Sequence, residues 1–339
     1  MRRIRFSPFS IGILIILVVL FFAGILKLWR VNENFTRQTG LNLFTVGKLV
    51  VDGGVSLKST DNRVNILLLG MAGGTHDGPD LTDTIIVASI NTKTHATALI
   101  SIPRDIWSDT LKDKINSAYH YGEAKKKGGG MILAKAIIED VVGLPIHYVA
   151  TLDFTQFESI IDTLGGIDVN VTQAFTDSEY PIAGRENDLC DGDPKFLCRY
   201  ETIQFDSGIQ HMNGSMALKY VRSRHAEGDE GTDFARGRRQ QDVISALKEK
   251  ILTAKLWFHP SLASLLFKTV DAATDSDMTV GEQLTIGKLL ARTASSAFKK
   301  ISIESFLVVP PTWMYGRYVL VPEKDYATVH AFVLNALEN

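Results

Sequence analysis

Short apolar runs separated by polar, glycine-containing segments dominate the sequence from residue 62 onward, a pattern typical of a folded domain that contains a sheet. The run Val64–Leu69 is almost wholly apolar and stops at Gly70, as expected of a strand that is buried on both faces. Two further strand-like runs, Thr84–Ile90 and Ala96–Ile102, are joined by the short segment Asn91–His95. This spacing predicts an antiparallel hairpin.

Helical periodicity follows the hairpin. Apolar positions over 131–142 recur at three and four residues and stop at Gly143, and 154–164 behaves in the same way before Gly165. The same patterns predict helices over 213–221 and 234–255 and strands over 148–152, 167–171, 305–309 and 318–321. Because strands and helices interleave without a Pro/Ser-rich linker, we expect residues 61–339 to form one α/β domain.

The N-terminal segment differs from the rest of the chain. Arginines occupy three of the first five positions, and an uncharged apolar run extends from Phe9 to Leu26. A hydrocarbon core of about 30 Å needs about 20 such residues. The positive flank predicts a cytoplasmic N-terminus and a single-pass anchor in the cell membrane within residues 1–32, followed by a stalk over 33–60. A cleaved signal peptide is the alternative, but no small-x-small cleavage site follows the run.

Composition limits the class of protein. The chain has 339 residues, of which 45% are hydrophobic and 22% are charged, so it is globular in character. The net charge of −2 gives no basic field for nucleic acid, and no partner of that kind is expected. The two cysteines, Cys190 and Cys198, lie eight positions apart in a polar segment. On the outer side of a membrane they are suited to a disulfide, and two unpaired thiols remain the alternative.

Two aspartates flank the predicted hairpin. Asp83 precedes its first strand and Asp105 follows its second, at similar distances from a turn centred near Lys93. Positions equally far from the turn lie side by side in an antiparallel pair, so we expect the two carboxylates to be neighbours. Close carboxylates favour a hard cation such as Mg²⁺ (or Mn²⁺), which binds one or two carboxylates together with phosphate oxygens. Turn capping by each aspartate separately is the alternative.

A second cluster contains the arginines. Arg222 and Arg224 follow one predicted helix, and Asp233 is a suitable N-cap for the next. The apolar stripe of that second helix, extended backward by helical steps, reaches Gln240 and Arg236, which we therefore expect to face the interior.

A buried arginine needs an anionic partner, and its fork matches phosphate oxygens. The arrangement favours an oxyanion site near a helix N-terminus. The alternative is internal pairing with the acids of the preceding loop, at Glu227, Asp229, Glu230 and Asp233, which the glycines around them suggest to be exposed.

Other catalytic signatures are weak. The glycine-rich segment 70–78 lacks both the P-loop ending and the spacing of a dinucleotide site, which disfavours a nucleotide enzyme. The histidines show no metal-binding spacing, and Ser101 and Ser223 lack a nucleophile elbow.

Taken together, the motifs resemble those of the LytR-CpsA-Psr family of cell-envelope proteins. The matching segments occur in family order: Asp83–Ile86, Ser101–Asp105, Lys114–Tyr119, Leu164–Ile167, Asn213–Arg224 and Asp233–Gln241. One departure is Leu81-Thr82, where the family often has Arg-Ser before the first aspartate. One arginine expected to hold phosphate is therefore missing.

The resemblance implies a central mixed β-sheet flanked by helices, with a long apolar tunnel for a polyprenyl chain. It also implies a phosphotransferase that moves a glycan with its phosphate from a polyprenyl-pyrophosphate carrier to peptidoglycan. Asp83 and Asp105 would then bind the metal, and Asp83 would accept the acceptor's proton. The expected catalytic residues are Asp83, Arg104, Asp105, Arg222 and Arg224, and the expected substrate-binding residues are Lys114, Asn116, Arg236, Arg239 and Gln240. A hydrolase of the same pyrophosphate and a non-catalytic lipid-phosphate-binding regulator are the rival hypotheses.

Overall fold

The computed structural model describes residues 54–73, 78–185, 187–253, 274–293 and 298–338, with a few further helical residues at 32, 33, 36, 262, 265, 266 and 268–270. The predicted anchor and most of the predicted stalk lie outside these ranges. Among the described residues, no helix is both long and apolar enough to cross a membrane.

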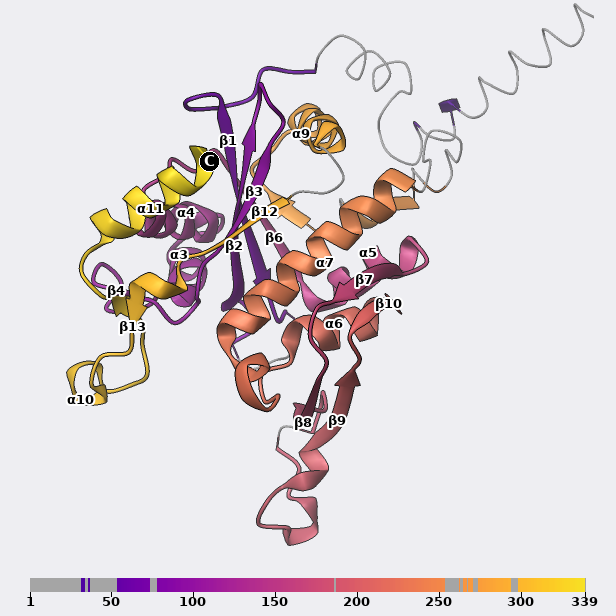
Figure 1. The fold of residues 1–339 in the computed structure, drawn as a ribbon, viewed down its shortest axis with the longest axis vertical. Coiled ribbons are helices and arrows are strands. Elements are labelled where there is room, and N and C mark those ends of the chain that lie inside the picture. Colours follow the sequence, from indigo (N-terminus) through magenta and orange to yellow (C-terminus); the bar gives the residue numbers. More distant parts are fainter. Residues whose placement is uncertain are drawn as a thin grey trace, which may run out of the picture.

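A mixed six-stranded sheet forms the centre of the described part of the chain, in the order β11-β6-β1-β2-β3-β12 (Figure 1). Strand β1 pairs antiparallel with β2 and parallel with β6, and β3 pairs antiparallel with β2 and parallel with β12. The mixed α/β fold expected from the sequence is thus confirmed. The strands are β1 (Arg63–Met71), β2 (Thr82–Asn91), β3 (Thr97–Ser101), β6 (Tyr148–Asp153), β11 (Thr274–Ser276) and β12 (Phe298–Ser302).

Helices cover both faces of this sheet (Figure 1). They are α3 (Ala118–Lys125), α4 (Gly129–Val142), α5 (Phe154–Thr163), α6 (Gly214–Arg222), α7 (Asp233–Thr253), α9 (Val280–Arg292), α10 (Thr312–Tyr315) and α11 (Tyr326–Glu338). The short strand pairs are β4 (Trp107–Ser108) with β5 (Asp113–Lys114), β7 (Ile167–Val171) with β10 (Gly208–Met212), β8 (Phe175–Pro181) with β9 (Tyr200–Phe205), and β13 (Leu307–Val308) with β14 (Val321–Pro322).

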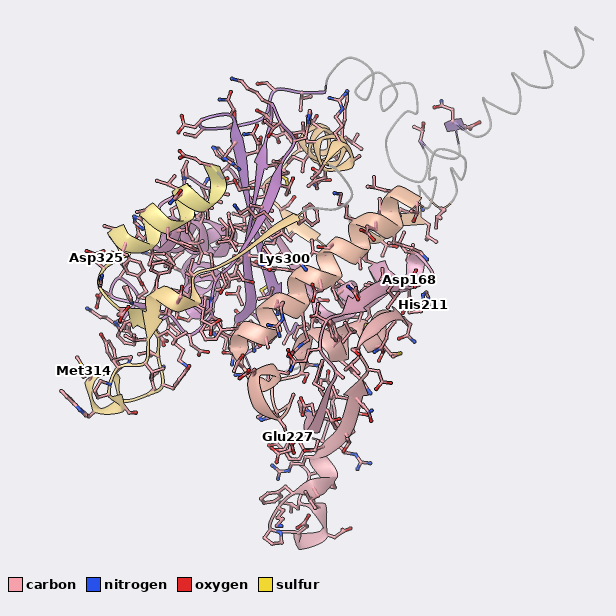
Figure 2. All side chains as sticks on the ribbon, in the orientation of Figure 1. Asp168, His211, Glu227, Lys300, Met314 and Asp325 are labelled. Carbon is pink, nitrogen blue, oxygen red and sulfur yellow. A yellow bond between two sulfur atoms is a disulfide. The ribbon has the colours of Figure 1, made fainter. Side chains whose placement is uncertain are left out.

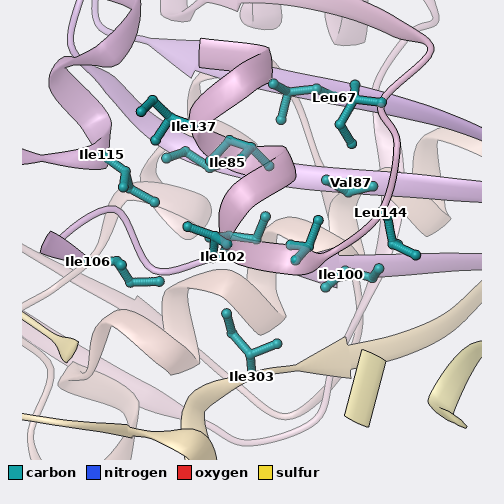
Figure 3. Packing of buried hydrophobic residues seen from close by; sticks show 14 of the residues in the cluster. Leu67, Ile85, Val87, Ile100, Ile102, Ile106, Ile115, Ile137, Leu144 and Ile303 are labelled. Carbon is teal, nitrogen blue, oxygen red and sulfur yellow. The ribbon is translucent and has the colours of Figure 1, made fainter. Parts of the chain in front are cut away.

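Side chains of the central strands alternate between two cores. Leu67, Ile85 and Ile100 point toward α3, α4 and α11, as Figure 3 shows for part of this cluster. Ile66 and Ile86 point to the opposite face, where α7 and α9 pack. Burial of both faces explains why β1 reads as a continuous apolar run rather than an alternating one.

Local signals set the ends of several helices. Helix α4 stops at Gly143, which has φ of 69°, and a Cβ there would lie 2.4 Å from the His330 ring. Helix α5 begins with a capping box in which Asp153 accepts a hydrogen bond from the Gln156 amide at 2.8 Å. These helices therefore begin and end close to where the sequence pattern predicts.

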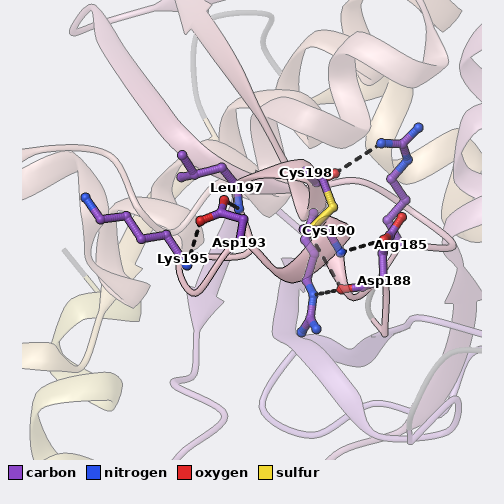
Figure 4. Close-up of a disulfide and its surroundings, with 8 residues drawn as sticks. Arg185, Asp188, Cys190, Asp193, Lys195, Leu197 and Cys198 are labelled. Carbon is purple, nitrogen blue, oxygen red and sulfur yellow. Dashed lines mark hydrogen bonds between the residues drawn. A yellow bond between two sulfur atoms is a disulfide. The ribbon is translucent and has the colours of Figure 1, made fainter.

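A two-stranded arm, formed by β8, β9 and the residues between them, projects from a third apolar cluster that includes Val169, Phe175 and Tyr220 (Figure 1). At its far end Cys190 and Cys198 form a disulfide with Cα atoms 5.5 Å apart, which confirms the predicted pairing (Figure 4). Asp188 accepts a hydrogen bond from the Cys190 amide at 2.9 Å. The sequence pattern did not predict the strands of this arm, because their apolar positions are few and widely spaced.

Candidate active site

The hairpin brings Asp83 and Asp105 together with an arginine between them. The β2–β3 register pairs Ile86 with Ser101, and its continuation places Asp83 opposite Arg104 rather than opposite Asp105. Arg104 Nη1 donates to Asp83 Oδ1, and Arg104 Nε lies 3.6 Å from Asp105 Oδ2. The Asn91 amide bonds the Ala96 carbonyl and centres the turn between Lys93 and Thr94, so the two carboxylates are neighbours, as expected, with Arg104 between them.

Asp105 is buried and held in its ionised form. Lys114 Nζ lies 2.5 Å from Asp105 Oδ1. Burial alone would raise the pKa of Asp105, but hydrogen bonds with Lys114 and Asp233 and the charge of Arg104 keep this pKa below its ordinary value. Lys114 therefore acts on the aspartate, and it lines neither of the two cavities described below.

Asn116 and Thr82 support this loop from the inside. Both are buried, and Thr82 Oγ1 donates to the Asn116 carbonyl at 3.1 Å. The Asn116 amide donates to the Arg104 carbonyl at 3.3 Å. Asn116 lines neither cavity, so the structure does not place it where the predicted contact with substrate would form. Its backbone amide helps to position Arg104 instead. Thr82, which stands in place of the family's usual serine, likewise points inward.

The second cluster lies where α6 ends. Asp177 of β8 is fully buried, and its Oδ2 accepts hydrogen bonds from Ser223 Oγ at 2.7 Å and from the amides of Arg224 and His225 at 3.1 Å each. These bonds fix the backbone that carries Arg222 and Arg224. No sequence motif singled out Asp177, because its partners lie more than forty positions away in a loop.

The first turns of helix α7 form the next part of the candidate site. Thr232, rather than the predicted Asp233, is the cap, since Thr232 Oγ1 accepts the Ala235 amide at 3.1 Å. Asp233 is therefore available to side chains, and its Oδ1 lies 3.2 Å from Arg236 Nη1 and 3.4 Å from Arg224 Nε. Arg236 is buried, as the helical stripe predicted.

Positive charge is concentrated around Arg236. Burial and the charges of Arg104 and Arg224 together lower the pKa of Arg236 to about 10, against the attraction of Asp233. Such crowding favours the binding of an anion, which relieves both the desolvation and the repulsion. Beside it, Gln240 Nε2 donates to Thr84 Oγ1 at 2.7 Å.

Arg239, in contrast, belongs to the interior of the fold. It is 1% exposed, and its guanidinium donates to the carbonyls of Tyr220 at 2.9 Å and Ser223 at 2.6 Å. Its Nη1 lies 2.9 Å from Glu230 Oε2. The prediction that Arg239 contacts substrate is wrong for this reason, and so is the expectation that Glu230 is exposed, since Glu230 is 3% exposed and also binds Arg238.

Breaking this buried pair is expected to destabilise the fold. We expect Glu230→Gln to lower the free energy of unfolding by about 3 kcal/mol, because Arg239 then stays buried without its counter-charge. Urea unfolding followed by circular dichroism measures the change. Glu227→Gln, an exposed acid in the same loop, is the control and should change stability by less than about 0.5 kcal/mol. Equal effects of the two substitutions would contradict the structural role of Glu230.

The buried carboxylate of Asp177 should make the free energy of unfolding depend on pH. Hydrogen bonds from Ser223 and the neighbouring amides outweigh burial and lower the pKa of Asp177. Its stabilisation is therefore complete above the unfolded-state pKa of about 3.9 and is lost as the pH falls toward the lower folded-state pKa. We expect Asp177→Asn to cost about 2 kcal/mol at pH 7, and the difference from the unaltered protein to shrink below about pH 4. Urea titrations at several pH values test this, and a difference that is independent of pH refutes it.

Most of the predicted site residues line two adjoining cavities. The smaller, of about 160 Å³, is lined by the polar side chains of Asp83, Thr84, Arg222, Arg224, His225, Arg236 and Gln240 and by Phe154, Tyr180, Pro181 and Val221. The larger, of about 380 Å³, shares Asp83, Arg236 and Gln240 with it and extends along β3 and β12. Of the ten predicted site residues, four line neither cavity: Asp105, Lys114, Asn116 and Arg239. Asp105 contacts Arg104, which lines the larger cavity.

Arg222 is the least neutralised cation of the smaller cavity. Its guanidinium stacks 4.3 Å from the Phe154 ring and 5.8 Å from the Tyr180 ring. No carboxylate of the described residues forms an ion pair with it, whereas Arg224 and Arg236 share Asp233. The sequence did not single out Phe154 or Tyr180 for this site, because neither is part of a motif. The cavity thus combines an apolar wall with a cationic floor and suits an anion attached to an apolar group.

Comparison with known proteins agrees with these features. The family model of the LytR_cpsA_psr family matches residues 37–331. The polyisoprenyl-teichoic acid–peptidoglycan teichoic acid transferase TagU of Oceanobacillus iheyensis is 31% identical over 259 residues, 72% of this chain and 70% of that protein. TagU of Bacillus licheniformis is 29% identical over 204 residues, 59% of this chain and 55% of that protein, so the chain spans about half the length of several such relatives.

A solved structure shares the fold. The crystal structure of B. subtilis TagV superposes with a TM-score of 0.59 at 24% identity and covers 83% of this chain and 99% of that one. The family match extends over most of the chain and includes every residue that lines the two cavities. The protein is therefore a member of the LytR-CpsA-Psr family.

Proposed function

We propose that the protein is a phosphotransferase of the cell envelope, which moves a glycan with its phosphate from a polyprenyl-pyrophosphate carrier to peptidoglycan. The observation that carries this proposal is the smaller cavity, where Arg222 lacks a carboxylate partner among the described residues and stacks beside an apolar wall. A pyrophosphate fits the cations, and the first units of a polyprenyl chain fit the wall. The activity named for the TagU relatives supports the same class of reaction.

The arginines act by positioning and by charge. Arg222, Arg224 and Arg236 bind the pyrophosphate oxygens, and their charges stabilise the negative charge that develops during transfer. Because Asp177 and Asp233 orient the backbone and side chains of these arginines, little reorganisation is needed when substrate binds. The missing arginine at Leu81-Thr82 is offset by this cluster.

Asp83 accepts the proton of the acceptor hydroxyl. The acceptor oxygen then forms a bond to the phosphorus that carries the glycan, the bond from this phosphorus to the bridging oxygen breaks, and polyprenyl phosphate leaves with the electron pair. Asp83 lines both cavities, so its carboxylate reaches the space between donor and acceptor. Arg104 holds it in place.

A divalent metal, Mg²⁺ or Mn²⁺, completes the proposal. Asp83, which lines both cavities, would hold a cation that takes one or two carboxylates and fills its other positions with phosphate oxygens and water, and Asp105 would join it by giving up its contact with Arg104. When bound, the metal supplies positive charge to the pyrophosphate. The ionised state of Asp105 is consistent with this use.

Location follows from the N-terminal sequence. We propose that residues 1–32 include a membrane anchor with its N-terminus in the cytoplasm, that 33–60 form a stalk, and that 61–339 form the extracytoplasmic catalytic domain. The disulfide between Cys190 and Cys198 supports an oxidising location. An anchored domain meets its lipid-linked substrate at a raised effective concentration.

The test uses the full chain in detergent with a short polyprenyl-pyrophosphate glycan and peptidoglycan oligomers. We expect mass spectrometry to detect a glycan-phosphate adduct on the oligomers, its loss with EDTA, and its return with Mg²⁺ or Mn²⁺. Arg222→Ala and Asp105→Ala should both abolish the adduct. Free glycan phosphate without an adduct would favour the hydrolase, and retained polyprenyl phosphate without turnover would favour the lipid-phosphate-binding regulator.

A further inference from the structure

The larger cavity adjoins the smaller one at Asp83, Arg236 and Gln240, and it extends from there between the first turns of α7 and the edge of the sheet. Helix α7 contributes residues 233–238, Gln240 and Gln241, and the sheet contributes the end of β3 and the residues from Lys300 to Glu304. Lys300 marks this edge in Figure 2, above α7, whereas Glu227 marks the loop below it. At about 380 Å³ the cavity is within the range of roughly 300–1,000 Å³ that small-molecule sites occupy.

Each cation that lines this cavity already contacts a carboxylate. Arg104 binds Asp83, and Arg236 is 3.2 Å from Asp233, which it shares with Arg224. Arg238 binds Glu230, which also pairs with Arg239, and Lys300 binds Asp242. Among the described residues, an anion would therefore compete with these carboxylates here, in contrast with the side of Arg222.

The rim is acidic and rich in hydroxyl groups. Asp229 and Glu304 are exposed at the rim, and neither forms an ion pair with a cation of the described residues. Hydroxyl groups at the rim come from Thr232 and Ser302. Carboxylates accept charge-assisted hydrogen bonds from ligand hydroxyls, so this rim suits a neutral polyol rather than an anion.

The floor of the cavity is apolar. Phe234, half-buried at the start of α7, lies among Ile85, Ile102 and Ile301. Gly237 adds no side chain, and a Cβ at this position would lie 2.9 Å from Ser101 Oγ. An aromatic and aliphatic floor with hydrogen-bonding groups at its rim matches a sugar ring, which has apolar C–H faces and polar edges.

We propose that the larger cavity binds the saccharide of the acceptor, presenting one of its hydroxyls to Asp83. This inference rests on the proposed function and adds to it the site that holds the saccharide of the acceptor. In phosphoryl transfer the attacking and leaving oxygens lie roughly in line on opposite sides of phosphorus. Because the polyprenyl phosphate leaves on the Arg222 side, the attacking hydroxyl enters from the side of the larger cavity, and Asp83 lies where the two cavities meet.

Isosteric substitutions on the rim test the proposal. In the full chain, Asp229→Asn with Glu304→Gln removes both charges and leaves the shape nearly unchanged. We expect the KM for soluble peptidoglycan oligomers to rise about tenfold or more, because charge-assisted bonds to the hydroxyls are lost, while the KM for the polyprenyl-pyrophosphate donor stays the same. Phe234→Leu should act in the same direction. The matched control is Glu227→Gln with Glu323→Gln, two exposed acids that line neither cavity.

Binding is measured separately from turnover. Saturation-transfer NMR with disaccharide–peptide fragments of peptidoglycan should show contact with the unaltered protein and a reduced signal with the rim variant. A raised donor KM with an unchanged acceptor KM would assign the cavity to the donor's own glycan and overturn the proposal. Kinetics and NMR signals equal to those of the control would also overturn it. Failure of the proposed function is distinct from both outcomes, because the unaltered protein would then form no adduct.

Discussion

Asp83→Asn is expected to lower kcat for transfer about 10³-fold, because asparagine cannot accept the proton of the acceptor hydroxyl. Asparagine matches aspartate in size, and its amide oxygen can still accept the hydrogen bond that Arg104 gives to Asp83. The fold and the arginine cluster should therefore persist, and the KM for the donor should change little. Adduct formation under saturating donor and acceptor, followed by mass spectrometry, measures the effect.

The matched control for this substitution is Asp80→Asn. Asp80 lies three residues before Asp83, but its carboxylate lies 2.8 Å from His120 Nδ1 and it lines neither cavity. We expect its kcat to remain within about twofold of that of the unaltered protein, because only an exposed pair is lost. If Asp83→Asn retained more than a tenth of the activity, Asp83 would not be the proton acceptor.

Arg222→Ala is expected to lower kcat/KM about 10³-fold, as removal of a catalytic arginine does in other phosphoryl transfers. Arg222 lacks a carboxylate partner among the described residues, so its charge is available to the pyrophosphate. Arg222→Lys should recover only part of this loss, because an ammonium neither forms the two parallel bonds of a guanidinium nor stacks equally well on Phe154.

Arg199→Ala provides the comparison for Arg222. Arg199 also stacks on a phenylalanine, with its guanidinium carbon 4.0 Å from the Phe196 ring, but it lies on the arm and lines neither cavity. We expect it to leave kcat/KM unchanged. Full recovery by Arg222→Lys would mean that Arg222 contributes charge alone, and equal effects of the two alanine substitutions would remove Arg222 from the site.

The arginines of this protein separate into two groups that the sequence presents as one. Arg236 and Arg239 lie one turn apart on α7, and both are buried. Arg236 faces two cavities and shares Asp233 with Arg224, whereas Arg239 is enclosed by Glu230 and backbone carbonyls. Residue type and helical spacing predict burial for such positions. They do not tell which buried arginine meets a ligand, because the answer depends on what other segments pack against it.

Much of the site was predictable because its signals are local. The hairpin that carries Asp83 and Asp105, the helix that carries Arg236, and the disulfide all arise between residues close in sequence. The spacing of Asp83 and Asp105 around the turn predicted that they are neighbours, but not the exact register, since the hydrogen bond that closes the turn decides it. The register matters because it places Arg104 between the two carboxylates.

Long-range contacts decided what the sequence left open. Asp177 orients Arg224 across 47 positions, and Gln240 meets Thr84 across 156. Neither contact has a periodicity or a motif that reveals it, because a hydrogen bond between distant segments depends on the path of the whole chain. The same holds for the two adjoining cavities, which combine residues of α7 with residues of distant segments and on which the assignment of donor and acceptor sides depends.

The sequence by itself determined the mixed α/β class of the protein and most helix and strand positions of its core, because these follow from periodicity, caps and short loops. Its spacing also pointed to the aspartates and arginines of the candidate site and to the cysteine pair, whose disulfide the structure then showed. Only the tertiary structure decided that Arg239, Asn116 and Lys114 support the site from within or behind, and that Arg222 is left without a carboxylate partner among the described residues. The physical reason is that burial and charge pairing are properties of the packed environment, which distant segments create together.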